Sequence, residues 1–301
     1  MDPAVVASGF VAVVGRPNAG KSTLVNALVG VKVAITSDTP QTTRHRLRAV
    51  LDRDEFQMVL VDTPGLHKPV DALGEEVNRS SILALADVDA VAFCIDATAP
   101  VGSGDRWVAE RVAKGRRPVV LVLTKADAAD PAAIERQLQA ARKLVTPAAE
   151  VVLSAKTGFN LERFVEAMLP YLPQGPRFFP RDMKTDQSDE VMLAELVREK
   201  VLRSTRDEVP HAVGVQLEDI EYDEGRDFHT VRCTIYVERE SQKGIIIGRG
   251  GEMIRSIGTE ARADMERLLG TGVHLDLRVK VKKDWRRDSS QIKRFGYGEG
   301  L

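Results

Sequence analysis

Apolar and amphipathic segments alternate through the first half of the chain. The runs at 10–14, 90–96 and 118–123 are almost continuously apolar, which is typical of strands buried on both faces of a parallel sheet. Further strands are expected at 46–51, 55–61 and 150–153. Helices are expected between the strands, at 21–29, 74–86, 105–114, 131–145 and 161–169. This alternation predicts an α/β fold: a doubly wound, mainly parallel sheet with helices on both faces.

The second half of the chain has a different pattern. Prolines at 170, 173, 176 and 180 lie among glycine, arginine and polar residues, so 173–189 is predicted to be a linker. Beyond it we expect a helix, two strands, a short helical stretch, a long helix and a last strand, at 190–205, 212–222, 227–239, 242–247, 252–269 and 273–281. The chain is therefore predicted to hold one domain at 8–172, a smaller α+β domain at 190–285, and a basic tail at 286–301.

Length and composition support two domains without indicating a partner. A chain of 301 residues is long for a single core, and its net charge of −1 does not mark it as a nucleic-acid-binding protein. Cys94 and Cys233 lie far apart in apolar runs, so we expect buried free thiols in a reducing cytosol. The chain start lacks a signal-peptide pattern, and no apolar run approaches the roughly 18–20 residues of a membrane helix. We expect a cytoplasmic protein.

A phosphate-binding loop is predicted between the first strand and the first helix. The sequence there matches the pattern G-x-x-x-x-G-K-[ST], which ends at Lys21 and Ser22. Its glycines let successive N–H groups approach phosphate oxygens, and the following helix directs its positive end to the same place. Lys21 can reach the β- and γ-phosphates, and the Ser22 hydroxyl can bind Mg²⁺. The predicted nucleotide contacts in this loop are Gly15, Arg16, Pro17, Asn18, Ala19, Gly20, Lys21, Ser22 and Thr23.

Three further loops follow strands of the predicted sheet, at the edge where ligands of open parallel sheets lie. Asp62 is placed to act on Mg²⁺ through water, and Gly65 offers an N–H to a γ-phosphate. Asp127 can accept the ring N–H and the exocyclic amine of guanine, a donor pair that adenine lacks, with Lys125 under the base plane. A backbone N–H at 154–156 can reach the guanine oxygen. The predicted contacts are Asp62, Thr63, Pro64, Gly65, Thr124, Lys125, Asp127, Ser154, Ala155 and Lys156.

Each of these loops alone is weak evidence, because D-x-x-G or T-K-x-D after a strand is more often an ordinary turn. All of them in this order, each at a predicted strand end, resemble the guanine-nucleotide-binding domains of the translation-factor-related GTPases. Asp127 and the Ser-Ala-Lys sequence at 154–156 disfavour a phosphate-loop kinase or ATPase. The sequence therefore favours GTP as the bound nucleotide.

A closer resemblance rests on three segments, which read GRPNAGKST at 15–23, QTTRHR at 41–46 and DTPGLH at 62–67. They resemble the Era family of GTPases, and the resemblance covers almost the entire chain. It implies a GTP-hydrolysing switch that binds single-stranded small-subunit (16S) ribosomal RNA near its 3′ end and assists 30S assembly, acting as a monomer. The family begins its guanine motif with Asn, whereas this chain has Thr124. A threonine can still join the loops by hydrogen bonding, so we expect guanine specificity to be kept.

Hydrolysis by the isolated protein is expected to be slow. Leu66 follows the D-x-x-G motif, where a glutamine would orient the attacking water, and leucine cannot orient water. Asn18 has two open interpretations: it stabilises the loop, or, by the resemblance, it helps bind K⁺ against the phosphates. Thr43 joins Ser22 and Asp62 as the predicted Mg²⁺ ligands. The predicted catalytic residues are Lys21, Thr43, Gly65 and Asn18.

A second glycine-rich loop lies in the smaller domain, between two helical stretches. Without side chains its backbone can approach a sugar–phosphate chain closely, and Arg249 adds a positive charge. The order of elements around it resembles a type II KH domain, whose G-x-x-G loop clamps about four nucleotides of single-stranded nucleic acid. The predicted RNA contacts in this loop are Ile247, Gly248, Arg249, Gly250 and Gly251.

Basic residues are concentrated between 278 and 294, around one tryptophan. Cations interleaved with an aromatic ring suit phosphate contact with base stacking, although a solvated strand edge is the alternative. The predicted RNA contacts here are Lys280, Lys282, Lys283, Trp285 and Arg286. The same surface could touch anionic lipid headgroups, which implies peripheral membrane contact at most.

Two other functions stay open. The first is an RNA-binding assembly module in which GTP is mainly structural, which Leu66 favours. The second is a related GTPase acting in tRNA modification, which shares the phosphate-loop and Thr-Thr-Arg patterns. Nothing requires such an enzyme to carry the unit at 190–281.

Overall fold

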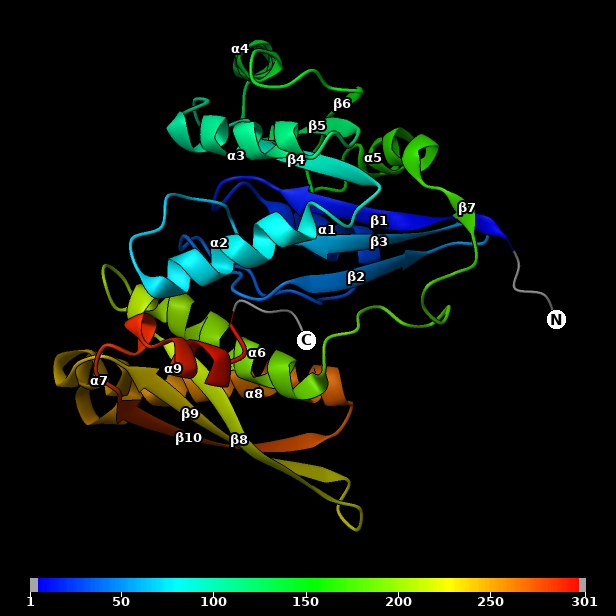
Figure 1. Ribbon diagram of the computed structural model, residues 1–301. Coiled ribbons are helices and arrows are strands. Elements are labelled where there is room, and N and C mark those ends of the chain that lie inside the picture. The colour runs from blue at the N-terminus through cyan, green and yellow to red at the C-terminus, as the bar shows by residue number, and fades with distance from the viewer. Residues whose placement is uncertain (1–4, 298–301) are drawn as a thin grey trace. The chain divides into compact units, whose positions relative to one another are not determined.

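The computed structural model describes residues 5–297, which form two compact units (Figure 1). Among the described residues, unit 1 contains 5–36, Thr43–Asp186 and Tyr297, and unit 2 contains Ser37–Thr42 and Gln187–Gly296. Within the polar segment that precedes the second strand, the chain therefore changes unit twice, between Thr36 and Ser37 and between Thr42 and Thr43.

Unit 1 is built on a sheet whose strands follow the apolar runs. They are β1 (Val6–Val14), β2 (Leu47–Asp52), β3 (Phe56–Asp62), β4 (Ala90–Asp96), β5 (Val119–Thr124) and β6 (Ala149–Val152). The strand order is β2-β3-β1-β4-β5-β6, and all neighbours are parallel except β2, which is antiparallel to β3. A short β7 (Gln174–Gly175), inside the predicted linker, pairs antiparallel with β1. The carboxyl ends of β1, β3, β4, β5 and β6 therefore meet at one edge.

Helices cover both faces of this sheet, so the prediction of a doubly wound fold is confirmed. Leu24 of α1 (Lys21–Val29) and Phe164 of α5 (Leu161–Met168) belong to one core cluster with alternate residues of β1. The opposite cluster holds side chains from α3 (Ser103–Lys114) and α4 (Pro131–Arg142), and from α2 (Ala72–Ala84) and the turn that follows it. Both clusters draw on β1, whose residues 11–14 are all fully buried.

Unit 2 is an α+β domain with a three-stranded sheet. Its elements are α6 (Asp189–Ser204), β8 (Gly214–Asp223), β9 (Phe228–Val237), α7 (Glu240–Ile247), α8 (Glu252–Leu269), β10 (Gly272–Val281) and α9 (Ser289–Arg294). The order is β10-β9-β8, with β9 parallel to β10 and antiparallel to β8. Leu196, Ile235 and Ile257 share one core cluster, which joins α6, β9 and α8.

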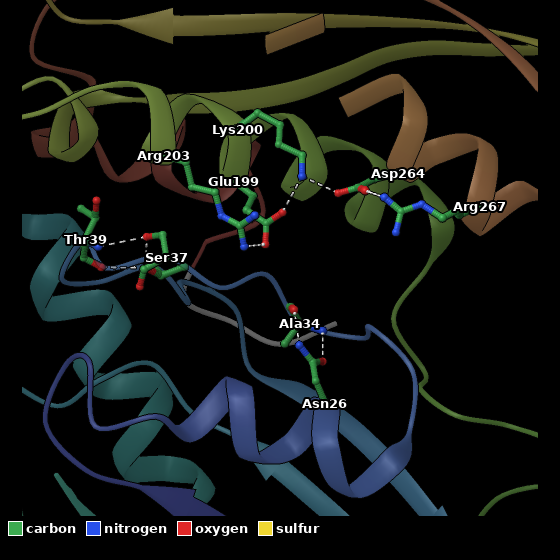
Figure 2. Close-up of polar contacts among 10 residues, drawn as sticks. Asn26, Ala34, Ser37, Thr39, Glu199, Lys200, Arg203, Asp264 and Arg267 are labelled. Carbon is green, nitrogen blue, oxygen red and sulfur yellow. Dashed lines mark hydrogen bonds and ion pairs between the residues drawn. The ribbon is translucent and has the colours of Figure 1, made fainter. Parts of the chain in front are cut away.

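A chain of ion pairs joins α6 to α8 inside unit 2 (Figure 2). Lys200 Nζ lies 3.1 Å from a carboxylate oxygen of Glu199 and 2.5 Å from one of Asp264. Arg203 extends the chain at Glu199, at 3.1 Å, and Arg267 extends it at Asp264. Of these contacts, the buried Lys200–Asp264 pair links α6 directly to α8, and removing one partner would leave an uncompensated charge.

The predicted basic tail is ordered where the structure describes it. After a turn at Trp285–Arg287, Asp288 caps α9 by accepting a hydrogen bond from Ser290 N at 2.9 Å. Ile292 and Phe295 then bury their side chains. An N-cap aspartate followed by apolar residues spaced three to four apart is a helix signal that the dense positive charge obscured. Residues 298–301 of that tail lie outside the described residues.

Both cysteines are buried, and burial raises the pKa of each thiol to about 12. Between residues 5 and 297, none of the helices is long and apolar enough to cross a membrane.

Candidate functional site

The phosphate-binding loop connects β1 to α1 at the carboxyl edge of the sheet. Asn18 and Gly20 take left-handed backbone conformations, with φ of 62° and 78°, so the loop curls tightly before the helix begins. Lys21 Nζ donates to the carbonyl oxygens of Gly15 and Arg16, at 3.2 and 3.1 Å. Burial lowers the pKa of Lys21, and the nearby Asp62 carboxylate opposes that shift. A buried ammonium held inside a loop of N–H donors is suited to bind an anion.

Three oxygen-bearing side chains converge beside this loop. Ser22 Oγ donates to Asp62 Oδ2 at 2.6 Å and lies 2.8 Å from Thr43 Oγ1. Among residues 5–297, Asp62 Oδ1 has no hydrogen-bond partner although it is buried. Burial raises the pKa of Asp62 to about 6, against the opposing effects of Lys21 and of the Ser22 hydrogen bond. Hard oxygen donors around an uncompensated carboxylate fit a divalent cation such as Mg²⁺.

The segment after β3 packs directly against the phosphate-binding loop. A Cβ on Gly65 would lie 2.6 Å from Pro17 Cα, so only glycine allows this approach. Leu66 donates its N–H to Gly15 O at 3.2 Å, and its side chain is fully buried. Thr63 is also fully buried, and its hydroxyl donates to Val13 O at 2.9 Å. Gly65 therefore lies against the phosphate-binding loop, whereas the side chains of Thr63 and Leu66 point into the protein.

The loops after β5 and β6 form a second group at the same edge. Thr124 Oγ1 lies 2.9 Å from Ala19 O and 3.1 Å from Ile95 O, so it ties β5 to the phosphate-binding loop and to β4. Ser154 Oγ donates to Asp127 Oδ1 at 2.6 Å, which joins the two segments predicted to contact the base. The structure thus brings 124–127 and 154–156 together, as a base-binding site requires.

Unit 2 contains a groove of about 400 Å³ between α8 and β10. It begins at the glycine-rich loop, where Gly248, Gly250 and Gly251 all have positive φ. Arg255 Nη2 donates to Gly250 O at 2.7 Å and supports the loop. Apolar side chains and basic groups share the lining, which consists of Gly251, Ile254, Arg255, Gly258, Thr259, Arg262, His274, Leu275 and Leu277.

Most of these lining residues were missed from the sequence. A signal for them exists, because Gly251, Arg255, Gly258 and Arg262 recur every three to four residues and so share one face of α8. Of the predicted loop contacts, Arg249 and Gly250 are exposed and Ile247 is half-buried, so these three stay a prediction.

Trp285 was wrongly placed on the RNA-binding surface. Its side chain is fully buried, its Nε1 donates to Ala212 O at 2.9 Å, and its ring meets Phe295 edge-on with centroids 4.9 Å apart. The sequence did not reveal the turn at Trp285–Arg287 or α9, after which Phe295 packs against the indole. Among its neighbours, Arg286 pairs with Glu238 at 2.8 Å and Lys282 donates to Gln291. Lys280 and Lys283 are exposed.

The class of protein follows from these two sites and from family models. Residues 10–125 match the model of the 50S ribosome-binding GTPases, and residues 208–286 match that of the KH domain. The chain is thus a phosphate-loop GTPase domain followed by a KH domain, as the sequence predicted.

Relatives identify the family. The GTPase Era of Mycobacterium sp. (strain KMS) is 48% identical over 294 residues, which cover 96% of this chain and 98% of the relative. The GTPase Era of Mycobacterium tuberculosis (strain ATCC 25177 / H37Ra) is 48% identical over 295 residues, with the same coverage. This chain belongs to the Era family and is a GTPase.

Two solved structures resemble the whole chain. A single-residue variant of Aquifex aeolicus Era bound to GDP·AlF4⁻ is 36% identical, has a TM-score of 0.93, and the match covers 97% of this chain and 99% of that one. Era in complex with MgGDPNP and nucleotides 1506–1542 of 16S ribosomal RNA is 37% identical, has a TM-score of 0.94, and the match covers 98% and 100%. The predicted family and fold are therefore confirmed.

Proposed function

We propose that this chain is a GTP-driven switch that binds small-subunit ribosomal RNA near its 3′ end and assists assembly of the 30S subunit. The observation that carries the nucleotide part is the convergence of Ser22, Thr43 and the buried Asp62 beside Lys21. The RNA part is supported by the basic groove beside the glycine-rich loop and by the related Era bound to nucleotides of 16S ribosomal RNA.

Ser22, Thr43 and Asp62 would hold Mg²⁺, which fits the unsatisfied Asp62 oxygen. When bound, the ion supplies positive charge that offsets the phosphate oxygens. Lys21 adds a second positive charge from inside the loop, and the Gly65 N–H is available to a γ-phosphate. Thr124 keeps the base-binding segment attached to the phosphate-binding loop through Ala19 O.

Asn18 is proposed to help hold K⁺ against the phosphates. Its exposed position in the tight turn, with a φ of 62°, supports a role at the loop surface. GTP turnover should rise when K⁺ replaces Na⁺, and the Asn18→Ala variant should lose that response. Equal rates in both salts for the wild-type protein would remove K⁺ from the proposal.

Leu66 favours a second candidate, in which GTP is mainly structural. Because its side chain is fully buried, it offers no group that could orient water. The two functions differ in what hydrolysis achieves. Under the switch proposal, protein loaded with a non-hydrolysable GTP analogue binds small-subunit particles but fails to leave them. Release that is independent of nucleotide state would favour the structural role.

The groove can be tested through its charge. Replacing Arg262 with Gln should weaken single-stranded RNA binding several-fold and lower the slope of log affinity against log salt by about one, because one phosphate contact is lost. Arg226→Gln, on the exposed turn between β8 and β9, is the matched control and should change neither quantity. An unchanged slope for Arg262→Gln would place the RNA elsewhere.

The ribosomal partner implies work in the cytoplasm, where we propose that the protein acts as a monomer. Membrane contact would be peripheral and would use exposed cations such as Lys280 and Lys283. Sedimentation equilibrium measures the mass in solution and so tests whether the protein is a monomer. Flotation with anionic vesicles, with and without competing RNA, tests the lipid contact, and protein that stays in the unbound fraction would exclude it.

A further inference from the structure

Asp96 lies at the carboxyl edge of the sheet, outside the loops from which the nucleotide site was predicted. It ends β4, and the strand register pairs it with Thr124, which ends β5. A hydrogen bond from Ala97 N to Thr124 O, at 3.0 Å, also joins the carboxyl ends of β4 and β5. Asp96 is therefore fixed next to the segment predicted to bind the guanine base.

The Asp96 side chain holds the ammonium group of Lys125. Lys125 Nζ lies 2.7 Å from Asp96 Oδ2. The other carboxylate oxygen accepts hydrogen bonds from Thr98 N and Thr98 Oγ1, at 2.8 and 2.6 Å. Burial raises the pKa of Asp96, but these contacts outweigh it and hold the pKa below its ordinary value. The carboxylate therefore stays ionised and its orientation is fixed by three donors.

This contact determines where the stem of Lys125 lies. The residue has a left-handed backbone with a φ of 57°, a conformation that a non-glycine residue adopts only when its surroundings favour it. Its Cε lies 3.9 Å from the position that a Cβ on Gly20 would occupy. The end of the Lys125 stem thus lies by the phosphate-binding loop, between Gly20 and Asp96, two residues before Asp127 in the chain.

We propose that Asp96 is a positioning residue for guanine recognition, which fixes the Lys125 stem as the surface on which the base lies. The inference rests on the proposed assignment of Lys125 and Asp127 to the base. Beyond that assignment, the geometry of this surface is determined by the Asp96 side chain at the end of the neighbouring strand, β4. Neutralising Asp96 frees Lys125 to sample other rotamers, and ordering it again opposes nucleotide binding.

The test is a double-mutant cycle in the full chain, read out by GDP titration and steady-state GTP turnover. Asp96→Asn should weaken GDP binding about tenfold, the size expected when one charge-assisted hydrogen bond is lost. KM should rise with little change in kcat, because the base lies away from the reacting phosphate. In a Lys125→Ala background the same substitution should have no further effect, because Asp96 acts through that lysine.

Glu150→Gln is the matched control. It removes a carboxylate from β6 that pairs with Arg142 at 2.6 Å, and it should leave GDP affinity unchanged. Equal losses from Asp96→Asn with and without Lys125, or no loss at all, would overturn the inference. Asp127→Asn separates this outcome from a failure of the base assignment: if it too leaves GDP affinity unchanged, the assignment itself is wrong.

Discussion

The two sites of this chain handle negative charge in opposite ways. In unit 1 the charged groups are enclosed, since Lys21 is 6% exposed and Asp62 is 0% exposed, and hydrogen bonds to Gly15 O and from Ser22 fix their positions. In unit 2 Arg255 and Arg262 are exposed along an open groove that apolar side chains also line. A small ligand of fixed shape is bound best by groups that are preorganised and shielded from water. A flexible RNA strand is bound best by accessible cations that displace its counterions. Single substitutions should therefore cost far more in the first site than in the second.

The largest effect is expected from Lys21→Ala. The substitution removes the buried ammonium that the phosphate-binding loop encloses, so GTP turnover should fall about 10²–10³-fold, as for other preorganised groups that stabilise developing charge. Single-turnover hydrolysis measures this loss. RNA affinity measured without nucleotide should be unchanged, which serves as the control for folding. A decrease of less than tenfold would mean that the enclosed site is not preorganised as described.

The second effect concerns Asp62 and pH. Because burial raises the pKa of this carboxyl to about 6, it binds a proton below that pH, and an incoming cation must displace that proton. Mg²⁺ affinity should therefore fall about tenfold per pH unit below pH 6 and level off above about pH 7. In nucleotide-free protein the sign for stability is opposite: the contribution of Asp62 is greatest below its ordinary value of 3.8 and is lost as pH rises through about 6.

Magnesium titrations of GDP binding at several pH values measure this dependence. Asp62→Asn, which cannot titrate, should bind Mg²⁺ weakly at every pH. An Mg²⁺ affinity that stays constant from about pH 5 to about pH 7 would contradict the raised pKa of the carboxyl.

The same contrast explains what could be predicted from the sequence. The predicted nucleotide site lies in loops that follow strands, where the fold restricts position and spacing, so Lys21, Asp62 and Asp127 could be predicted from local pattern alone. The groove lies between a helix and a strand, and its arginines, Arg255 and Arg262, are two helical turns apart without a fixed motif. The prediction for Trp285 was wrong for a related reason. Its burial depends on α9, whose apolar positions are few and lie among basic residues. The Asp96–Lys125 pair depends on strand register, which the sequence does not display.

An effect of intermediate size on RNA affinity is expected at Gly250. Substitutions there distinguish the effect of charge from that of side-chain size. Among residues 5–297, no atom other than its chain neighbours lies within 4 Å of a Cβ built at this position, and its backbone (φ 58°, ψ 17°) is one that Asn and Asp tolerate. Gly250→Asp should lower single-stranded RNA affinity about tenfold by placing a negative charge against the phosphates, and Gly250→Asn should lower it much less.

Gly248 is less informative for this purpose, because a Cβ there would lie 2.7 Å from Met253 Cβ and would distort the loop itself. GTP affinity should stay unchanged in both Gly250 variants. Equal losses of RNA affinity for the Asp and Asn variants would show that the size of the side chain, and not its charge, decides binding at this position. The groove would then resemble the enclosed nucleotide site, and the contrast between the two sites would be wrong.

The smallest effect on RNA binding is expected from Trp285→Phe. Phenylalanine keeps most of the apolar volume against Phe295 and Gly214 but loses the hydrogen bond to Ala212 O, so the free energy of unfolding should fall by about 1–3 kcal/mol. Because the indole lies inside unit 2, RNA affinity below the unfolding transition should stay within about twofold, where loss of a stacked base would cost about 1–3 kcal/mol of binding. Urea unfolding and RNA titration of the same preparation distinguish the two cases. A decrease in RNA affinity with unchanged stability would return Trp285 to the interface and would mean that the basic segment reorganises when RNA binds.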